Sequence, residues 1–214
     1  MATVPQTCRA IASLTQVPER TVGHLARRLG EAEMLPRGPR GVNAPHIEPV
    51  HAARILIGVM SLTDGINATA AKVVQAVERI GALDRGGEGG FEVYASGDPD
   101  DSDTKYEMVP YGSFIENVAQ LLQLKEAREQ VAAVGLRFDG EHVSGWSEYK
   151  IAEGQPNHIV DVRRVYFGGL RPVSSGMSQE VRVDGSVLDR LSALLEERAA
   201  EPSNEIQAAA AGGR

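Results

Sequence analysis

The sequence has little of several features that would place it in other classes of protein. A single cysteine, Cys8, excludes an internal disulfide and a cysteine-rich metal site. The longest apolar run, 52–60, contains Arg54 and is too short to cross a bilayer, so we expect no membrane contact. The first residues lack a basic segment followed by an apolar one, which predicts no signal peptide and a cytoplasmic location. Aromatic residues make up only 5% of the chain, so the core must be mainly aliphatic.

Patterns that indicate catalysis or a bound cofactor are also missing. No glycine-rich loop precedes a helix that carries a lysine, and no serine, histidine or aspartate stands in the spacing of a known nucleophile. His46 and His51 lie five residues apart with Glu48 between them, but a metal site needs three or four ligands in a fixed geometry, and this proline-rich segment supplies no fourth. The acidic loop from Asp98 lacks the Gly and Glu positions of a calcium loop. We therefore expect no enzyme activity, no cofactor and no metal ion.

Charge is distributed unevenly along the chain, whose net charge is −7. Residues 1–60 carry seven Arg and four Glu, a net charge of +3, and the remaining residues carry fifteen Lys or Arg and twenty-five Asp or Glu, a net charge of −10. A small basic region attached to an acidic one is typical of a DNA-binding module fused to a different module.

Hydrophobic periodicity predicts helices over most of the first 83 residues. The expected helices are 7–17, with Thr7 as its N-cap, and 18–34, 48–62 and 66–83. Between the second and third lies 35–49, where four prolines and two glycines exclude a helix and predict an extended, turn-rich segment.

The second part of the chain predicts a mixture of strands and helices. Residues 113–133 have helical spacing and begin with the capping box of Ser113 and Glu116. The period then changes to two, which predicts antiparallel strands and a closing helix at 134–151, 158–168, 177–183 and 186–199. The fold class is therefore α+β.

Four regions follow from these elements and from composition. They are an N-terminal helical head with its supporting helices (1–83), an acidic and glycine-rich linker with a short strand at 91–95 (84–112), an α+β domain for oligomerisation or effector binding (113–199), and a disordered tail (200–214).

The order of elements in 7–62 predicts a winged helix-turn-helix that binds duplex DNA. A short helix, a tight turn and a second helix would place the second helix in the major groove, and the Arg-Gly-Pro-Arg-Gly segment follows where a wing would lie. Outward positions of the second helix and the wing supply the expected DNA contacts. We expect base or groove-edge contacts from Arg20, Thr21, His24 and Arg28, and phosphate contacts from Arg27, Arg37 and Arg40.

The run RTVGHLARRLGEAEMLPRGPRGVNAPHIEPVHAARIL resembles the MerR-type winged helix and its relatives among phage small terminase subunits of the lambda type. Arg20-Thr21-Val22 matches the start of the recognition helix, 33–36 its exit and 37–43 the wing. Gly23-His24-Leu25 replaces the aromatic pair usual in that helix. The resemblance covers about a quarter of the chain and implies DNA binding.

Three functions remain open on this reading. The first is a phage- or prophage-type transcription regulator, in which 113–199 forms a dimer or binds an effector. The second is a small terminase subunit, in which the same head recognises viral DNA for packaging and the chain assembles into a ring. The third is a protein-interaction module without DNA binding, which the acidic body would suit.

Overall fold

The computed structural model describes residues 2–38, 45–62, 70–83, 91–94, 112–139, 142–150, 162–168 and 178–197, and it has the α+β composition that the sequence predicts. Its elements in chain order are α1 (Val4–Thr15), α2 (Glu19–Glu31), α3 (Pro49–Ser61), α4 (Ala70–Gly81), β1 (Phe91–Tyr94), α5 (Phe114–Gln123), α6 (Lys125–Gln130), β2 (Val131–Asp139), β3 (His142–Lys150), β4 (Val162–Phe167), β5 (Ser178–Asp184) and α7 (Gly185–Glu197). The predicted tail, most of the predicted linker and the first residues of the predicted fourth helix lie outside the described residues.

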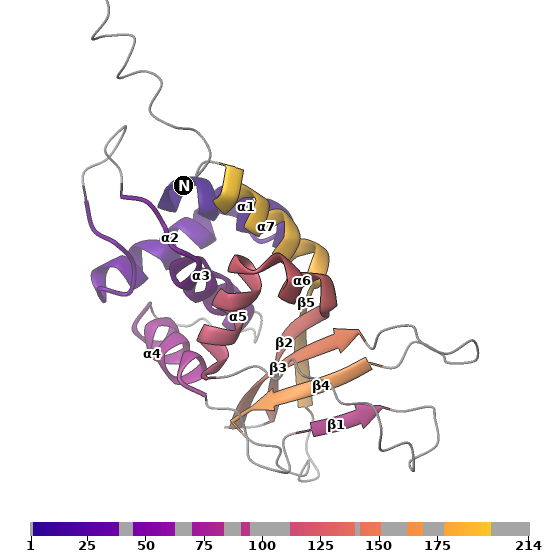
Figure 1. The fold of residues 1–214 in the computed structure, drawn as a ribbon. Coiled ribbons are helices and arrows are strands. Elements are labelled where there is room, and N and C mark those ends of the chain that lie inside the picture. Colours follow the sequence, from indigo (N-terminus) through magenta and orange to yellow (C-terminus); the bar gives the residue numbers. More distant parts are fainter. Residues whose placement is uncertain are drawn as a thin grey trace, which may run out of the picture.

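Helix α3 lies at the centre of the helical part of the molecule. Its residues from Ile55 to Ser61 are all buried, as expected for a helix that is covered on several sides. It contacts α2 and α4 of the head and α5 of the second half, and α7 lies alongside α1 (Figure 1). None of the helices in the described part of the chain is long and apolar enough to span a membrane.

Helix α1 begins earlier than the sequence pattern predicts, so the proposed N-cap Thr7 is wrong. Thr3 is the N-cap, and its backbone N–H donates to Gln6 Oε1 at 3.0 Å, which is one half of a capping box. Thr7 is buried inside the helix, where its hydroxyl donates to the carbonyl of Thr3 at 3.1 Å. The spacing Thr-x-x-Gln was the available signal for the true start.

The single helix predicted for 113–133 is wrong in its second half. Its start is correct, since Ser113 N–H donates to Glu116 Oε2 at 2.7 Å in the predicted capping box. The helix breaks at Leu124, whose backbone is extended, and Arg128 from α6 donates to the freed carbonyls of Leu121 and Leu122 at 3.4 and 3.2 Å. Residues from 131 onward then join the sheet, where ladder hydrogen bonds outweigh the helical preference of alanine.

The strands form one antiparallel sheet in the order β1-β4-β3-β2-β5. Strands β2 and β3 make the hairpin predicted around Asp139, which pairs with His142, and β2 also pairs with β5. Helix α5 covers one face. The ring centroids of Phe114 and Phe167 are 5.3 Å apart. Phe114 also packs closely on Gly145, because a Cβ on this glycine would lie 2.7 Å from the Phe114 ring.

The opposite face of the sheet, here called the outer sheet face, carries Trp146, Glu148, Arg164, Glu180 and Arg182. These residues alternate with the ones that contact α5, so they project to the other side. Trp146 is fully buried and lies across Gly135, with the guanidinium of Arg164 at 4.2 Å from its ring centroid. Arg164 also contacts Glu148 at 2.9 Å and Glu180 at 2.7 Å, and Arg182 contacts Glu148 at 3.0 Å.

The helical head and the sheet share one hydrophobic core. Buried residues of α1, α2, α3, α5, α7 and the helix-facing side of the sheet belong to a single cluster. The division of the chain into two domains at 84–112 stays a prediction, because the described residues include only one short strand of that region.

Candidate nucleic-acid interface

Helices α1 and α2 are joined by a turn of three residues, Gln16 to Pro18. Gln16 takes a left-handed conformation with φ of 58°, which ends α1, and Pro18 then fixes the direction in which α2 starts. The carbonyl of Pro18 accepts from the N–H groups of Thr21 and Val22 at 2.8 and 3.2 Å. A short helix, a tight turn and a second helix are therefore present at the predicted place.

One side of α2 holds the helix against the rest of the head. Val22, Leu25, Ala26 and Leu29 are buried. Leu25 packs on Gly58 of α3 so closely that a Cβ on this glycine would lie 2.8 Å from its side chain. Because this stripe is continuous, the orientation of α2 on the molecule is fixed, and so is the side that it turns to solvent.

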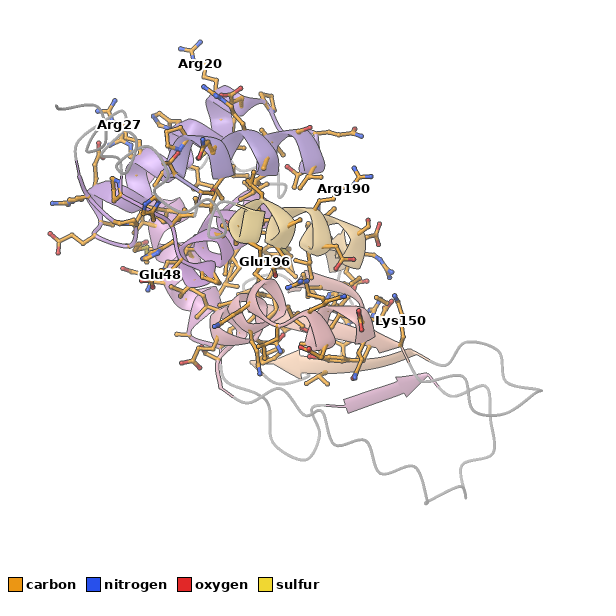
Figure 2. All side chains as sticks on the ribbon, turned by 45° about the horizontal axis from the view of Figure 1, so that its top comes forward. Arg20, Arg27, Glu48, Lys150, Arg190 and Glu196 are labelled. Carbon is orange, nitrogen blue, oxygen red and sulfur yellow. The ribbon has the colours of Figure 1, made fainter. Side chains whose placement is uncertain are left out.

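The other side of α2 presents the predicted DNA contacts together. Arg20, His24 and Arg27 follow one another at spacings of four and three residues, so they lie on one face of the helix, and all three are exposed. The side chains of Arg20 and Arg27 extend into solvent on the side remote from the sheet (Figure 2). Thr21 and Arg28 flank the stripe, the first exposed and the second half-buried. We call Arg20, Thr21, His24, Arg27 and Arg28, with Glu31, the α2 face.

The arginines of this face differ in their partners. Arg20 makes no hydrogen bond or ion pair with any residue that the structure describes. Arg27 Nε and Arg28 Nη1 contact the two oxygens of Glu31 at 2.9 and 2.8 Å. Hydrogen bonds from Arg27 and then Arg28 lower the pKa of Glu31, so this carboxylate is charged at neutral pH. Arg20 is thus the arginine that is free to meet a ligand without breaking a contact.

Arg37, predicted to contact phosphate from the wing, makes hydrogen bonds to the end of α2 in the free protein. Its guanidinium turns back to the end of α2, where Nε donates to the carbonyl of Gly30 at 2.9 Å and Nη2 to that of Glu31 at 2.7 Å. It also contacts Glu33 at 3.4 Å. These contacts satisfy carbonyls that a helix end leaves unpaired. A phosphate contact by Arg37 stays a prediction.

The end of α2 itself lies at Glu31 rather than at residue 34. Glu33 has a φ of 63°, and the N–H of Met34 donates to the carbonyl of Leu29 at 2.9 Å, as in a Schellman motif. Arg54 of α3 donates to the carbonyl of Met34 at 2.6 Å. The helical periodicity of 18–34 continues through this reversal, so the pattern predicted too long a helix.

The two ends of the predicted wing loop lie side by side. A Cβ on Gly38 would lie 2.8 Å from Pro45, so the chain enters and leaves 39–44 at one place, as a wing loop requires. Beyond it, Thr3 and His46 form an isolated antiparallel bridge, and the N–H of Ile47 donates to the carbonyl of Ala2 at 2.9 Å. Arg40 falls within 39–44, outside the described residues, and its predicted phosphate contact stays a prediction.

Sequence reasoning missed the acidic and capping residues around α2. The spacing of Glu31 from Arg27 and Arg28, four and three residues, was a sufficient signal for their ion pairs. The hydrogen bond from Arg54 to Met34 had no such signal, because twenty residues separate them. Local pairs can be predicted from spacing, and contacts between helices cannot.

Other reactive side chains of the head serve the fold. His51 Nδ1 accepts from the N–H of Glu48 at 3.1 Å and so caps α3. Burial, with a smaller effect of Glu19, raises the pKa of Cys8 to about 11, which keeps this thiol protonated. In the part of the chain that the structure describes, no three His, Cys, Asp or Glu side chains come together to hold a metal ion.

With this geometry established, the chain was compared with known proteins. Comparison with family models, with curated proteins and with solved structures finds no match to this chain.

Proposed function

We propose that this protein binds duplex DNA through the α2 face, with α1, the turn and α2 acting as a helix-turn-helix. The observation that supports this most strongly is the common exposed stripe of Arg20, His24 and Arg27 on a helix whose opposite side is buried. The major groove of B-DNA accommodates one helix, and arginine is the side chain that most often reads guanine there.

The roles of the arginines follow from their surroundings. Arg20 lies near the start of α2 and has no described partner, so it can enter the groove and contact a base edge without the loss of an ion pair. Arg27 and Arg28 lie farther along the helix and would contact phosphates. The predicted wing, 37–43, would reach the DNA backbone beside them.

The proposed biological role is that of a transcription regulator that binds its site as a symmetric dimer. One head presents few DNA contacts, and dimerisation doubles them. Light scattering on the purified protein tests this role, because a dimer or tetramer fits a regulator and a ring of about eight or more chains would fit a packaging subunit instead.

The test of DNA binding is a random-site selection followed by titrations of the selected duplex at several salt concentrations. If Arg20 reads a base, Arg20→Ala weakens binding to the selected site by roughly 5- to 150-fold. On a duplex changed at the one base that Arg20 contacts, the variant and the wild-type chain should then bind equally well. If Arg27 contacts a phosphate, Arg27→Ala reduces the slope of log affinity against log salt by about 0.9.

Arg190→Ala is the matched control for these variants. Arg190 is an exposed arginine of α7, away from the α2 face (Figure 2), so its removal changes the net charge equally without touching the proposed interface. Equal losses for Arg20→Ala and Arg190→Ala, or no selected sequence at all, would contradict the proposed function.

A further inference from the structure

One carboxylate occupies two arginines of the α2 face. Glu31 Oε1 contacts Arg27 at 2.9 Å and Glu31 Oε2 contacts Arg28 at 2.8 Å, so both oxygens are used. A DNA phosphate offers guanidinium groups the same kind of charged acceptor oxygens. A phosphate that binds Arg27 or Arg28 must therefore compete with Glu31.

The position of Glu31 contributes little to the stability of α2. It is the last residue of the helix, where the helix dipole disfavours a negative charge. Its arginine partners precede it in the sequence, which is the weaker orientation for such pairs. The side chains of all three residues are at least 40% exposed, and exposed ion pairs stabilise proteins only slightly. Stabilisation of the helix is thus a poor explanation for Glu31.

Arg28 is also incompletely satisfied in the free protein. Its Nη1 donates to Glu31, but its Nε is buried and finds no hydrogen-bond acceptor in the part of the chain that the structure describes. A buried donor without an acceptor costs free energy, so this guanidinium would gain from a further acceptor. By contrast, the side chain of Arg20 has no partner among the described residues and does not contact Glu31.

We infer that Glu31 limits the affinity of the α2 face for any duplex, because it occupies Arg27 and Arg28 in place of DNA phosphates and thereby weakens sequence-independent binding. This inference rests on the proposed function. Phosphate contacts are the same for every sequence, whereas the base contact of Arg20 is not. Competition by Glu31 lowers the affinity for all duplexes and leaves the discrimination by Arg20 in place, so the protein spends less time on the wrong DNA.

The test compares Glu31→Gln with the wild-type chain on the selected duplex and on a duplex of scrambled sequence. The variant should bind the scrambled duplex roughly 2- to 30-fold more tightly, as expected from the release of two exposed ion pairs. The slope of log affinity against log salt should become steeper by about 0.9 for each new phosphate contact. The affinity for the selected duplex should rise by a similar factor, because the phosphate contacts are the same for both duplexes, so the ratio of specific to scrambled affinity should stay unchanged.

Glu33→Gln is the matched control. Glu33 is 78% exposed, lies two residues away and contacts Arg37 rather than Arg27 or Arg28, so its replacement removes the same charge from almost the same place. It should raise the affinity for scrambled DNA less than Glu31→Gln does. In a chain that already carries Arg27→Ala and Arg28→Ala, Glu31→Gln should have no larger effect than Glu33→Gln.

Equal gains for the two Glu→Gln variants would overturn the inference, because the effect would then be one of net charge. Weaker binding by Glu31→Gln would overturn it too, since Glu31 would then position the arginines. If neither the wild-type chain nor Glu31→Gln binds any duplex, the proposed function fails before the inference is reached.

Discussion

The molecule carries two clusters of arginines and carboxylates that differ in exposure and reach. On the α2 face, Glu31 pairs with arginines three and four residues away on the same helix, and the side chains are 40–73% exposed. On the outer sheet face, Glu148 is 8% and Arg164 17% exposed, and the contacts join β3, β4 and β5. The ion pairs of the α2 face therefore join residues of a single helix, whereas those of the outer sheet face connect three strands.

This difference separates a surface that can exchange partners from one that cannot. An exposed ion pair already competes with water and salt, so a ligand can replace one partner at little cost. Burial disfavours the charge of Arg164, but hydrogen bonds to Glu148 and Tyr166 and the nearby Glu180 outweigh it and raise its pKa. Loss of one partner there would leave a charge uncompensated in a poorly solvated place. Ligand binding is thus better suited to the α2 face, and structural support to the outer sheet face.

The largest expected difference between the two clusters is in stability. Glu148→Gln removes the carboxylate that accepts from Arg164 and Arg182, so it should reduce the free energy of unfolding by about 3 kcal/mol. Glu31→Gln removes an exposed carboxylate and should leave the denaturation midpoint almost unchanged. Urea denaturation followed by circular dichroism measures both. A comparable loss for the two variants would show that the comparison above is wrong.

Substitution of one glycine in each region, Gly135 in the sheet and Gly23 in α2, should change stability by a smaller amount. A Cβ on Gly135 would lie 2.1 Å from Trp146 and 2.5 Å from the carbonyl of Val181, so Gly135→Ala should destabilise the fold by about 1–3 kcal/mol. A Cβ on Gly23 of α2 would meet nothing within 4 Å, and Gly23→Ala should stabilise the protein by up to about 1 kcal/mol. Thermal unfolding of both variants measures the two changes in stability. A gain in stability for Gly135→Ala would contradict the close packing of Trp146 on this glycine.

Acidification provides the smallest expected effect, and it acts on the head through His51. Burial, and to a smaller degree Arg54, lower the pKa of His51 despite Glu48, and its Nδ1 must stay unprotonated to accept from the N–H of Glu48. As the pH falls, His51 is therefore protonated at a higher pH in the unfolded chain than in the folded one. Stability from His51 is complete above an unfolded pKa of about 6.5 and is lost as the pH falls toward the lower folded value.

His51→Gln is the matching variant, because glutamine at this position can accept from the N-cap N–H without titrating. The stability of the variant, measured by urea denaturation between about pH 7 and 5, should decline less than that of the wild-type chain. Parallel declines would mean that other groups account for the loss.

The sequence predicted the elements well where their signals were local. The stripe of Arg20, His24 and Arg27 and the capping box of Ser113 were read from spacing alone, and the antiparallel strands followed from their alternation. The core of the head is mainly aliphatic, as the low aromatic content predicts, and Leu25 and Leu29 are buried in it. The errors lie at the ends of elements, as at Leu124, where α5 stops short of residue 133, and at the start of α1, which begins at Val4 rather than at residue 7.

By itself the sequence determined the α+β class, the positions of most helices and strands, and the side of α2 that faces solvent. Each of these depends on residues within about one helical turn or one strand, whose preferences are visible in the order of side chains. The tertiary structure alone decided the strand order, the contacts of Arg164 across the sheet and the hydrogen bond from Arg54 to the carbonyl of Met34. Those depend on residues far apart in the sequence, sixteen positions for Arg164 and its two carboxylates and twenty for Arg54 and Met34. Which of many possible partners meet is set only when the whole core packs.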